Sequence, residues 1–205
     1  MKVIAVSGGV ACGKSGFSRR FVERAGSGRA GVINCDEIVA ELYQDPGVVE
    51  DLAGVGRSCG RDLTDSTGGL DRRKLRELLF DNSQFRVRIE EVVHPLVFQR
   101  VISRLNALSD MVRMTLIEVP LLYEVDFPLN RDLDLVVASS RRVQYRRLLD
   151  VRGLEPALAE RILNAQMPLA DKIRRADVVV WNDGSLAAFE NQIDHLFQRC
   201  ETIFN

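Results

Sequence analysis

Five short apolar runs punctuate the chain, and most of them end at polar residues. They lie at Val3–Val6, Val32–Ile33, Met114–Val119, Leu135–Ala138 and Val178–Trp181. The third and fifth runs are nearly continuous rather than alternating, which is typical of strands buried on both faces. The pattern therefore predicts a parallel β-sheet covered by helices.

Between these runs, apolar residues return at the spacing of an α-helix. One stripe comprises Phe17, Phe21, Val22 and Ala25, and a second comprises Leu186, Phe189, Ile193, Leu196 and Cys200. Such a stripe is the face that a helix buries. We therefore expect an α/β fold, with the aromatic residues of both stripes and Trp181 in its core.

The interval 37–112 contains no convincing strand and has the pattern of several helices. Asp71 is expected to cap a helix that starts at Arg72, and Pro95 is expected to begin another helix. A crossover between parallel strands needs only about a dozen residues, so this interval is too long for a simple connection. We expect a helical insertion within one domain spanning 1–205, of the kind that often holds a second substrate.

Two further helical patterns follow the fourth run, at 141–151 and 155–166. This segment is dense in arginine, at positions 141, 142, 146, 147, 152 and 161. For any single arginine, a solvated helical face is the simpler interpretation.

Composition narrows the class of protein. The 205 residues carry a formal net charge of −1, which argues against a general attraction to nucleic acid or anionic lipid. No apolar run approaches the length of about 18 residues that a bilayer requires, and no signal-peptide layout is present, so we expect a cytoplasmic protein. The four cysteines are scattered and have no histidine at ligand spacing, which makes structural zinc or a disulfide framework improbable.

The segment GGVACGKS, residues 8–15, follows the first apolar run directly and precedes the first helical stripe. It fits the P-loop pattern G-x-x-x-x-G-K-[ST], in which backbone N–H groups and a helix N-terminus surround phosphate oxygens. Lys14 would reach the β- and γ-phosphates of ATP, and the Ser15 hydroxyl would bind Mg²⁺. The residues expected to surround the nucleotide phosphates are Gly9, Val10, Ala11, Cys12, Gly13, Lys14, Ser15 and Gly16.

Two acids stand at the carboxyl ends of predicted strands, the edge at which α/β sheets hold ligands. Asp36 follows the second run, where it would accept a proton from an attacking hydroxyl, help to hold magnesium, or cap the next helix. Glu118 ends the third run in the manner of a Walker B segment that orients magnesium. A helix cap or an ion pair with arginine remains the alternative for Glu118.

Seven ordered segments together resemble the dephospho-CoA kinase family along nearly the whole chain. They are GGVACGKS, NCDEIVAEL, GGLDRRKLRELLF, HPLV, EVPLLYE, QMPLADK and ADVVVWNDG. The resemblance implies a three-layer P-loop kinase fold with a helical substrate-binding insertion at 37–112 and a helical lid at 139–174. It also implies transfer of the γ-phosphoryl group of ATP to the ribose 3′-hydroxyl of dephospho-CoA, the last step of coenzyme A synthesis.

The resemblance further implies roles for individual residues. Asp36 would be the general base, and Arg147 a lid arginine near the transferred phosphate. Asn182 would lie near the adenine of ATP. The acceptor would be held by Asp36, Leu70, Arg73, His94, Pro120 and Leu121, and the metal by Ser15 and Glu118. For His94, a hydrogen-bonded residue at a helix entry is an equal alternative.

The chain departs from the family pattern at three points. One is a further lid arginine, which has no clean match near Val151 and for which Arg152 is an open candidate. The other two are single positions. Asn34 stands where the family commonly has the first of two aspartates, and Gly16 stands where threonine is usual. Rival functions are another nucleoside or nucleotide kinase and a regulatory nucleotide-binding protein, although the guanine-reading string Asn-Lys-x-Asp is missing from the sequence. We expect small-molecule substrates only, with no nucleic acid, no membrane and no obligate protein partner.

Overall fold

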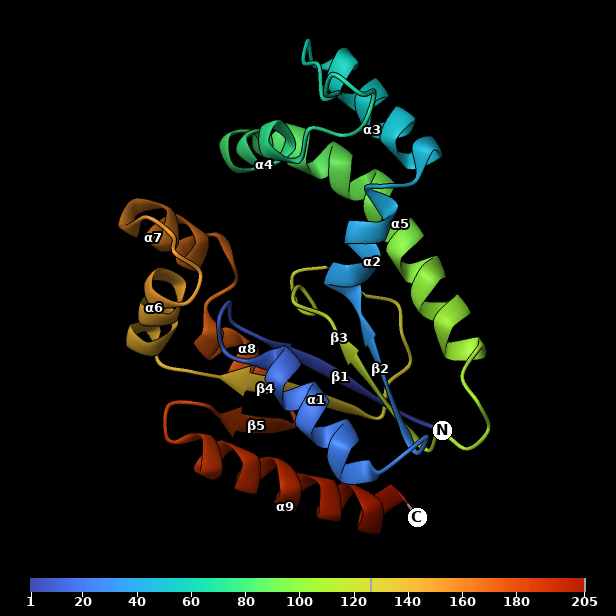
Figure 1. Ribbon diagram of the computed structural model, residues 1–205, viewed down its shortest axis with the longest axis vertical. Coiled ribbons are helices and arrows are strands. Elements are labelled where there is room, and N and C mark those ends of the chain that lie inside the picture. Colours follow the sequence, from blue (N-terminus) through green and yellow to red (C-terminus); the bar gives the residue numbers. More distant parts are fainter. Residues whose placement is uncertain (126, 205) are drawn as a thin grey trace. The chain divides into compact units, whose positions relative to one another are not determined.

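The computed structural model describes residues 1–125 and 127–204, apart from the side chain of Phe80. The chain forms two compact units, one made of Met1–Asn34 and Ala107–Asn205, the other of Cys35–Asn106. The first unit carries the whole β-sheet, and the second is helical (Figure 1).

The sheet of the first unit has five parallel strands in the order β2-β3-β1-β4-β5. The strands are β1 (Lys2–Gly8), β2 (Ala30–Asn34), β3 (Met114–Glu118), β4 (Leu133–Ala138) and β5 (Val178–Trp181). Each of the five apolar runs forms a strand, so the predicted parallel-sheet α/β fold is confirmed. Strands β2 and β3 lie on one side of β1, and β4 and β5 lie on the other, so the strand order reverses direction at β1. Ligands of α/β proteins bind at the carboxyl ends of the strands beside such a reversal.

Five helices belong to this unit: α1 (Lys14–Ala25), α6 (Arg141–Asp150), α7 (Pro156–Ala165), α8 (Leu169–Arg175) and α9 (Leu186–Phe204). Helices α1 and α9 pack against each other and against the sheet. Phe17, Phe21 and Phe189 are buried in this core, as predicted. Helix α8, which the apolar pattern did not predict, packs against β1 and β4.

Trp181 is the exception among the predicted core residues, because 47% of its surface is exposed. It ends β5, which is an edge strand and so has no neighbour on its outer side. The carboxamide of Gln192 in α9 bonds both backbone groups of Trp181, accepting from its N–H at 3.1 Å and donating to its carbonyl at 2.9 Å. Leu186 is also exposed, because the buried face of α9 begins at Phe189.

The second unit contains α2 (Cys35–Leu42), α3 (Pro46–Ser58), α4 (Arg72–Asp81) and α5 (Ser83–Asn106). In its described residues the only extended pairing is a single bridge between Thr64 and Leu70. The predicted cap at Asp71 is confirmed, because its carboxylate accepts the N–H groups of Arg73 and Lys74 at 3.1 and 3.0 Å.

The prediction that Pro95 begins a helix is wrong, because Pro95 lies inside α5. The helix starts earlier, where Asn82 accepts the Phe85 N–H at 2.9 Å. An interior proline costs about 3 kcal/mol, but burial of one apolar face along the whole of α5 offsets that cost. The buried residues of this face are Phe85, Ile89, Val93, Val97, Val101 and Leu105. His94 precedes Pro95 within α5 and is therefore not a helix-entry residue.

In the described part of the chain, no helix has the length and apolar character needed to cross a bilayer.

Candidate active site

The loop between β1 and α1 has the backbone of a phosphate cradle. Gly8, Ala11 and Gly13 have positive φ values of 146°, 57° and 95°. At Gly8 a side chain is also excluded by space, because a Cβ atom would lie 2.2 Å from the Val137 carbonyl oxygen. Ala11 is the only non-glycine residue of the described chain with positive φ, and such strain is characteristic of functional loops.

Several N–H groups of this loop are available to an anion. Those of Ala11, Gly13, Ser15 and Gly16 donate to no acceptor in the described part of the chain. The last two belong to the first turn of α1, whose N-terminus carries a partial positive charge. A phosphate group would satisfy these donors, so the loop fits the triphosphate that its sequence predicts.

Lys14, the predicted phosphate-binding lysine, extends back along the loop. Its ammonium group donates to the carbonyl of Gly9 at 3.1 Å and to that of Gly8 at 3.5 Å. These contacts keep its charge next to the loop, where it would complement a phosphate.

Glu118 at the end of β3 is buried, with 3% of its surface exposed. Its Oε2 accepts a hydrogen bond from the Ser15 hydroxyl at 3.1 Å and one from the Asn34 amide at 3.4 Å. The structure thus brings the two predicted metal-binding residues into contact. One hydroxyl and one carboxylate suit Mg²⁺, which keeps several waters and takes its remaining ligands from nucleotide phosphates. In the described residues, no group of three or more acidic, histidine or cysteine side chains could hold a metal ion by itself.

Arg147 and Asn182 both contact the cradle. Arg147 in α6 donates from Nη1 to the Ala11 carbonyl at 3.0 Å and to the Ser139 hydroxyl at 3.1 Å, and from Nη2 to the Asn182 carbonyl at 2.9 Å. The Asn182 side chain donates to the Cys12 carbonyl at 2.9 Å. In this structure, both side chains bind the loop itself.

Two glutamines that the sequence did not single out hold Val10. The Gln166 carboxamide accepts the Val10 N–H at 3.2 Å, and Gln144, which is 6% exposed, donates to the Val10 carbonyl at 2.8 Å. The only feature of the sequence that pointed to Gln166 is its place in the segment QMPLADK. Gln144 lies in the arginine-dense helix α6, and nothing in the sequence indicated that it would bind the loop.

Cys12 lies beneath the cradle and is completely buried. Burial raises the pKa of its thiol, and the nearby positive charge of Lys14 and hydrogen bonds to Ser139 and Gly9 oppose that shift only in part. The thiol therefore stays protonated at neutral pH and acts as a packing group. The described cysteines are all free thiols, in line with the sequence prediction.

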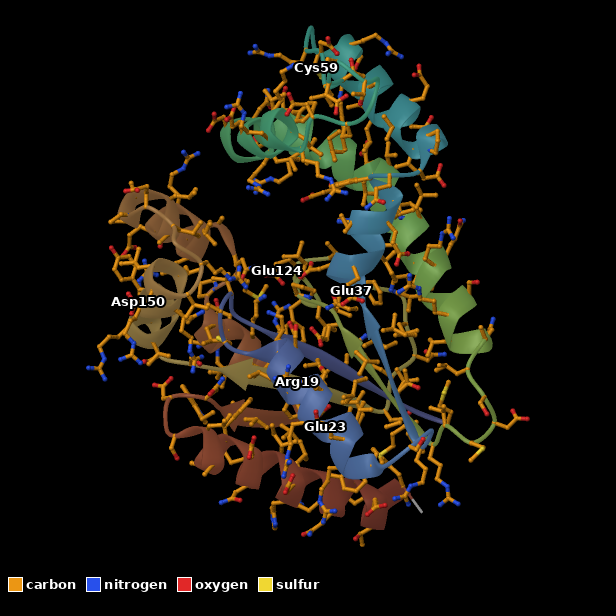
Figure 2. All side chains as sticks on the ribbon, viewed as in Figure 1. Arg19, Glu23, Glu37, Cys59, Glu124 and Asp150 are labelled. Carbon is orange, nitrogen blue, oxygen red and sulfur yellow. The ribbon has the colours of Figure 1, made fainter. Side chains whose placement is uncertain are left out.

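The turn after β3 contains Pro120 and Leu121, both predicted to contact the acceptor. Leu121 is half-buried, and the Pro120 carbonyl accepts hydrogen bonds from Lys172 at 2.7 Å and from the Ser7 hydroxyl at 3.4 Å. Glu124, labelled in Figure 2, lies in the same turn and pairs with Lys172 at 2.8 Å. Neither charged residue was singled out, although both lie in motif segments.

Four predicted substrate residues belong to the helical unit. Asp36 is the second residue of α2, with an exposed side chain, and Arg73 is exposed in the first turn of α4. His94 is half-buried in α5, and Leu70 is buried, with 7% of its surface exposed. Leu70 also pairs with Thr64 of the same unit.

The family model for dephospho-CoA kinase matches residues 2–188. The chain belongs to the dephospho-CoA kinase family. The dephospho-CoA kinase of Anaeromyxobacter dehalogenans is 35% identical over 199 residues, which cover 96% of this chain and 90% of that protein. The solved structure of TT1252 from Thermus thermophilus is 26% identical over 97% of both chains, with a TM-score of 0.79. That of a dephospho-CoA kinase from Campylobacter jejuni, 22% identical over 98% of both chains with a TM-score of 0.65, supports the fold.

Membership of the dephospho-CoA kinase family makes the chain a phosphotransferase that uses ATP. Two of the departures from the expected dephospho-CoA kinase pattern now have a structural setting. The Asn34 side chain, at the position where an aspartate was expected, donates to Glu118 at 3.4 Å. At Gly16, a Cβ atom would meet nothing within 4 Å, so glycine is not required there for steric reasons.

Proposed function

We propose that this chain transfers the γ-phosphoryl group of ATP to the ribose 3′-hydroxyl of dephospho-CoA, giving coenzyme A and ADP. The observation that carries the proposal is the family match over residues 2–188. In the same chain, several N–H groups of the P-loop have no acceptor among the residues that the structure describes. The reaction breaks the bond between the γ-phosphorus and the β,γ-bridging oxygen, and forms a bond from the γ-phosphorus to the 3′-oxygen.

Asp36 is the proposed general base. Its exposed carboxylate follows the carboxyl end of β2 by two residues, and that edge of the sheet also bears the cradle. The carboxylate would accept the proton of the 3′-hydroxyl as the oxygen attacks phosphorus. Asp36 would also help to hold the acceptor, together with Leu70, Arg73 and His94 of the insertion 37–112. Pro120 and Leu121 are the proposed acceptor contacts from the sheet-bearing unit.

Ser15 and Glu118 would hold a magnesium ion, Ser15 directly through its hydroxyl and Glu118 through water. When bound, magnesium supplies positive charge that neutralises the phosphate oxygens. The residues of the chain itself provide the rest of the environment. The N–H groups of the cradle bind phosphate oxygens, Lys14 adds a cation beside them, and the segment 139–174 would exclude water as a lid.

A panel of acceptors tests the assignment. Purified protein is incubated with ATP and magnesium and with dephospho-CoA, adenosine, AMP or shikimate as the acceptor, and ADP release is measured. We expect kcat/KM for dephospho-CoA to exceed that for every other acceptor by at least about 10², because specific contacts to the acceptor must discriminate at this level. Equal turnover of AMP would identify a nucleotide kinase instead, and a strict preference for GTP without transfer would identify a regulatory protein.

A further inference from the structure

Three consecutive carbonyl groups of the cradle are bonded by side chains from outside the loop. The Val10 carbonyl accepts from Gln144, the Ala11 carbonyl from Arg147, and the Cys12 carbonyl from Asn182. We call these three donors the carbonyl clamp. They come from two places in the chain, α6 and the residue that follows β5.

The clamp fixes the direction of the N–H groups that follow these carbonyls. Across a trans peptide, the C=O of one residue and the N–H of the next point in opposite directions, and the described chain has no cis peptide. Carbonyls held on the outside of the loop therefore turn the N–H groups of Ala11, Cys12 and Gly13 toward its inside. The Cys12 N–H closes a turn with the Gly9 carbonyl, whereas those of Ala11 and Gly13 have no acceptor in the described chain.

Helix α6 is suited to this task because its two donors are three residues apart and share a face. The helix is itself tied to the segment after β5. The Ser139 hydroxyl donates to the Asn182 carbonyl at 3.0 Å, and the Ser140 N–H donates to Asp183 at 2.7 Å. The clamp is therefore one connected hydrogen-bonded structure that joins α6, the cradle and the segment after β5.

The guanidinium group of Arg147 is the centre of this network. In the described part of the chain, its acceptors are two backbone carbonyls and one hydroxyl, with no carboxylate among them. The group is half-buried, and its planar donors are oriented by these three oxygens. Three of its five N–H donors are thus committed to the cradle and to the residues that support it.

We propose that Gln144, Arg147 and Asn182 are positioning residues that shape the cradle, and that Arg147 acts through the loop rather than on the transferred phosphoryl group. The proposal depends on the proposed function in one respect only, namely that the cradle binds an adenine nucleotide. The family resemblance implies instead that Arg147 lies near the transferred phosphate. Positioning of the loop and direct contact with the phosphate have different kinetic consequences.

The roles separate because ATP and ADP share the α- and β-phosphates. A clamp that shapes the loop affects both nucleotides equally, and the affinity of the free enzyme for either one falls. An arginine that contacts only the transferred group stabilises the transition state, so its loss lowers kcat and leaves ADP binding unchanged.

The test uses Arg147→Lys and Gln144→Met, with Arg146→Ala as the matched control. Arg146 is the exposed neighbour of Arg147 on the same helix. Calorimetry measures Kd for ADP and for ATP, and steady-state kinetics measure kcat and KM. The single ammonium nitrogen of lysine cannot reproduce the planar fork with which Arg147 reaches its acceptors from two nitrogens. We therefore expect Kd for both nucleotides to rise by about 10-fold to 100-fold in Arg147→Lys. The loss of one neutral hydrogen bond in Gln144→Met should raise both by about fivefold. The control should bind both as the parent does.

Chemical rescue adds an independent readout. Guanidinium ion added at millimolar concentration to Arg147→Ala should restore ADP affinity, which general destabilisation of the fold would not allow. If Arg147→Ala does not fold, the ADP Kd values of Arg147→Lys and Gln144→Met test the proposal instead. An unchanged ADP Kd in both of them, with kcat reduced in Arg147→Lys, would overturn the proposal. Because ADP binding needs no acceptor, failure of the dephospho-CoA assignment would leave these measurements interpretable.

Discussion

The ammonium group of Lys172 lies 2.8 Å from a carboxylate oxygen of Glu124, and no part of the lysine side chain is exposed. The same ammonium donates to the Pro120 carbonyl, and Glu124 also accepts the N–H of Met167 at 3.2 Å. This ion pair, whose lysine is buried, thus connects α8, the segment that leads into it and the turn after β3. That segment also carries Gln166, whose side chain binds the cradle.

We expect Lys172→Met to lower the free energy of unfolding by about 3 to 5 kcal/mol, because it leaves the Glu124 carboxylate and the Pro120 carbonyl without their buried partner. Urea denaturation followed by circular dichroism measures the change. The double variant Lys172→Met with Glu124→Gln should recover part of the loss, since it removes the uncompensated charge. A single variant as stable as the parent would show that the pair contributes nothing to folding.

Lys14→Ala should reduce kcat/KM by at least about 10² while the melting temperature changes by less than about 2 °C. The lysine charge contributes to phosphate binding, and its ammonium group donates to the loop carbonyls of Gly9 and Gly8, contacts that belong to the cradle and not to the hydrophobic core. Arg19, exposed on α1 (Figure 2), provides the control as Arg19→Ala. A large fall in melting temperature with normal activity would mean that Lys14 is structural.

Asp36→Asn should keep the fold and ATP binding but lose roughly 10² to 10⁴ in turnover, the usual contribution of a general base. The amide has nearly the same shape as the carboxylate and cannot accept the proton. Turnover is measured with saturating dephospho-CoA, and Glu37→Gln in the same helical turn serves as the control. Near-normal turnover of Asp36→Asn would remove this residue from the mechanism.

Gly16→Ala should raise the melting temperature by about 1 to 2 °C. Gly16 lies in the first turn of α1, its φ is not positive, and a Cβ atom there meets nothing within 4 Å. Alanine costs about 0.5 to 1 kcal/mol less than glycine within a helix, and a chain of this size shifts by a few degrees per kcal/mol. Differential scanning calorimetry gives the answer, and a lower melting temperature would reveal a steric conflict.

Stability at alkaline pH should depend on Tyr123. Burial raises the pKa of its phenol to about 12, and the negative charge of Asp134 adds to the shift. Because an unfolded tyrosine ionises near pH 10, the folded state binds this proton more tightly. The contribution of the protonated Tyr123 phenol to the free energy of unfolding is therefore complete below about pH 10, and it is lost as the pH rises toward 12. In Tyr123→Phe, the melting temperature should therefore fall less between pH 10 and 11.5 than in the parent, and parallel curves would contradict this.

The sequence predicted the parts of the fold that depend on local pattern. Each apolar run became a strand, and the P-loop took its predicted place between β1 and α1, because glycine spacing and apolar continuity act over a few residues. Pro95 shows the limit of such reasoning. A proline favours a helix start locally, but the buried face of α5 extends on both sides of it and determines where the helix runs.

The supports of the candidate site were beyond the reach of a local pattern. Gln144, Gln166 and Lys172 are ordinary polar residues, and each meets a partner that is 48 or more positions away in the chain. Their function depends on the arrangement of α6 and α8 beside the loop. The residues proposed to contact ATP could be named from a motif, whereas those that hold the loop in shape required the structure.

The paired bonds between Gln192 and Trp181 bear on how this molecule behaves at high concentration. An unpaired strand edge is a template on which a second molecule can add a strand, and growth of that kind leads to fibrils. At the carboxyl end of β5 both backbone groups that would recruit such a strand are already occupied by a side chain. One glutamine thus protects the sheet from edge-to-edge association at this point.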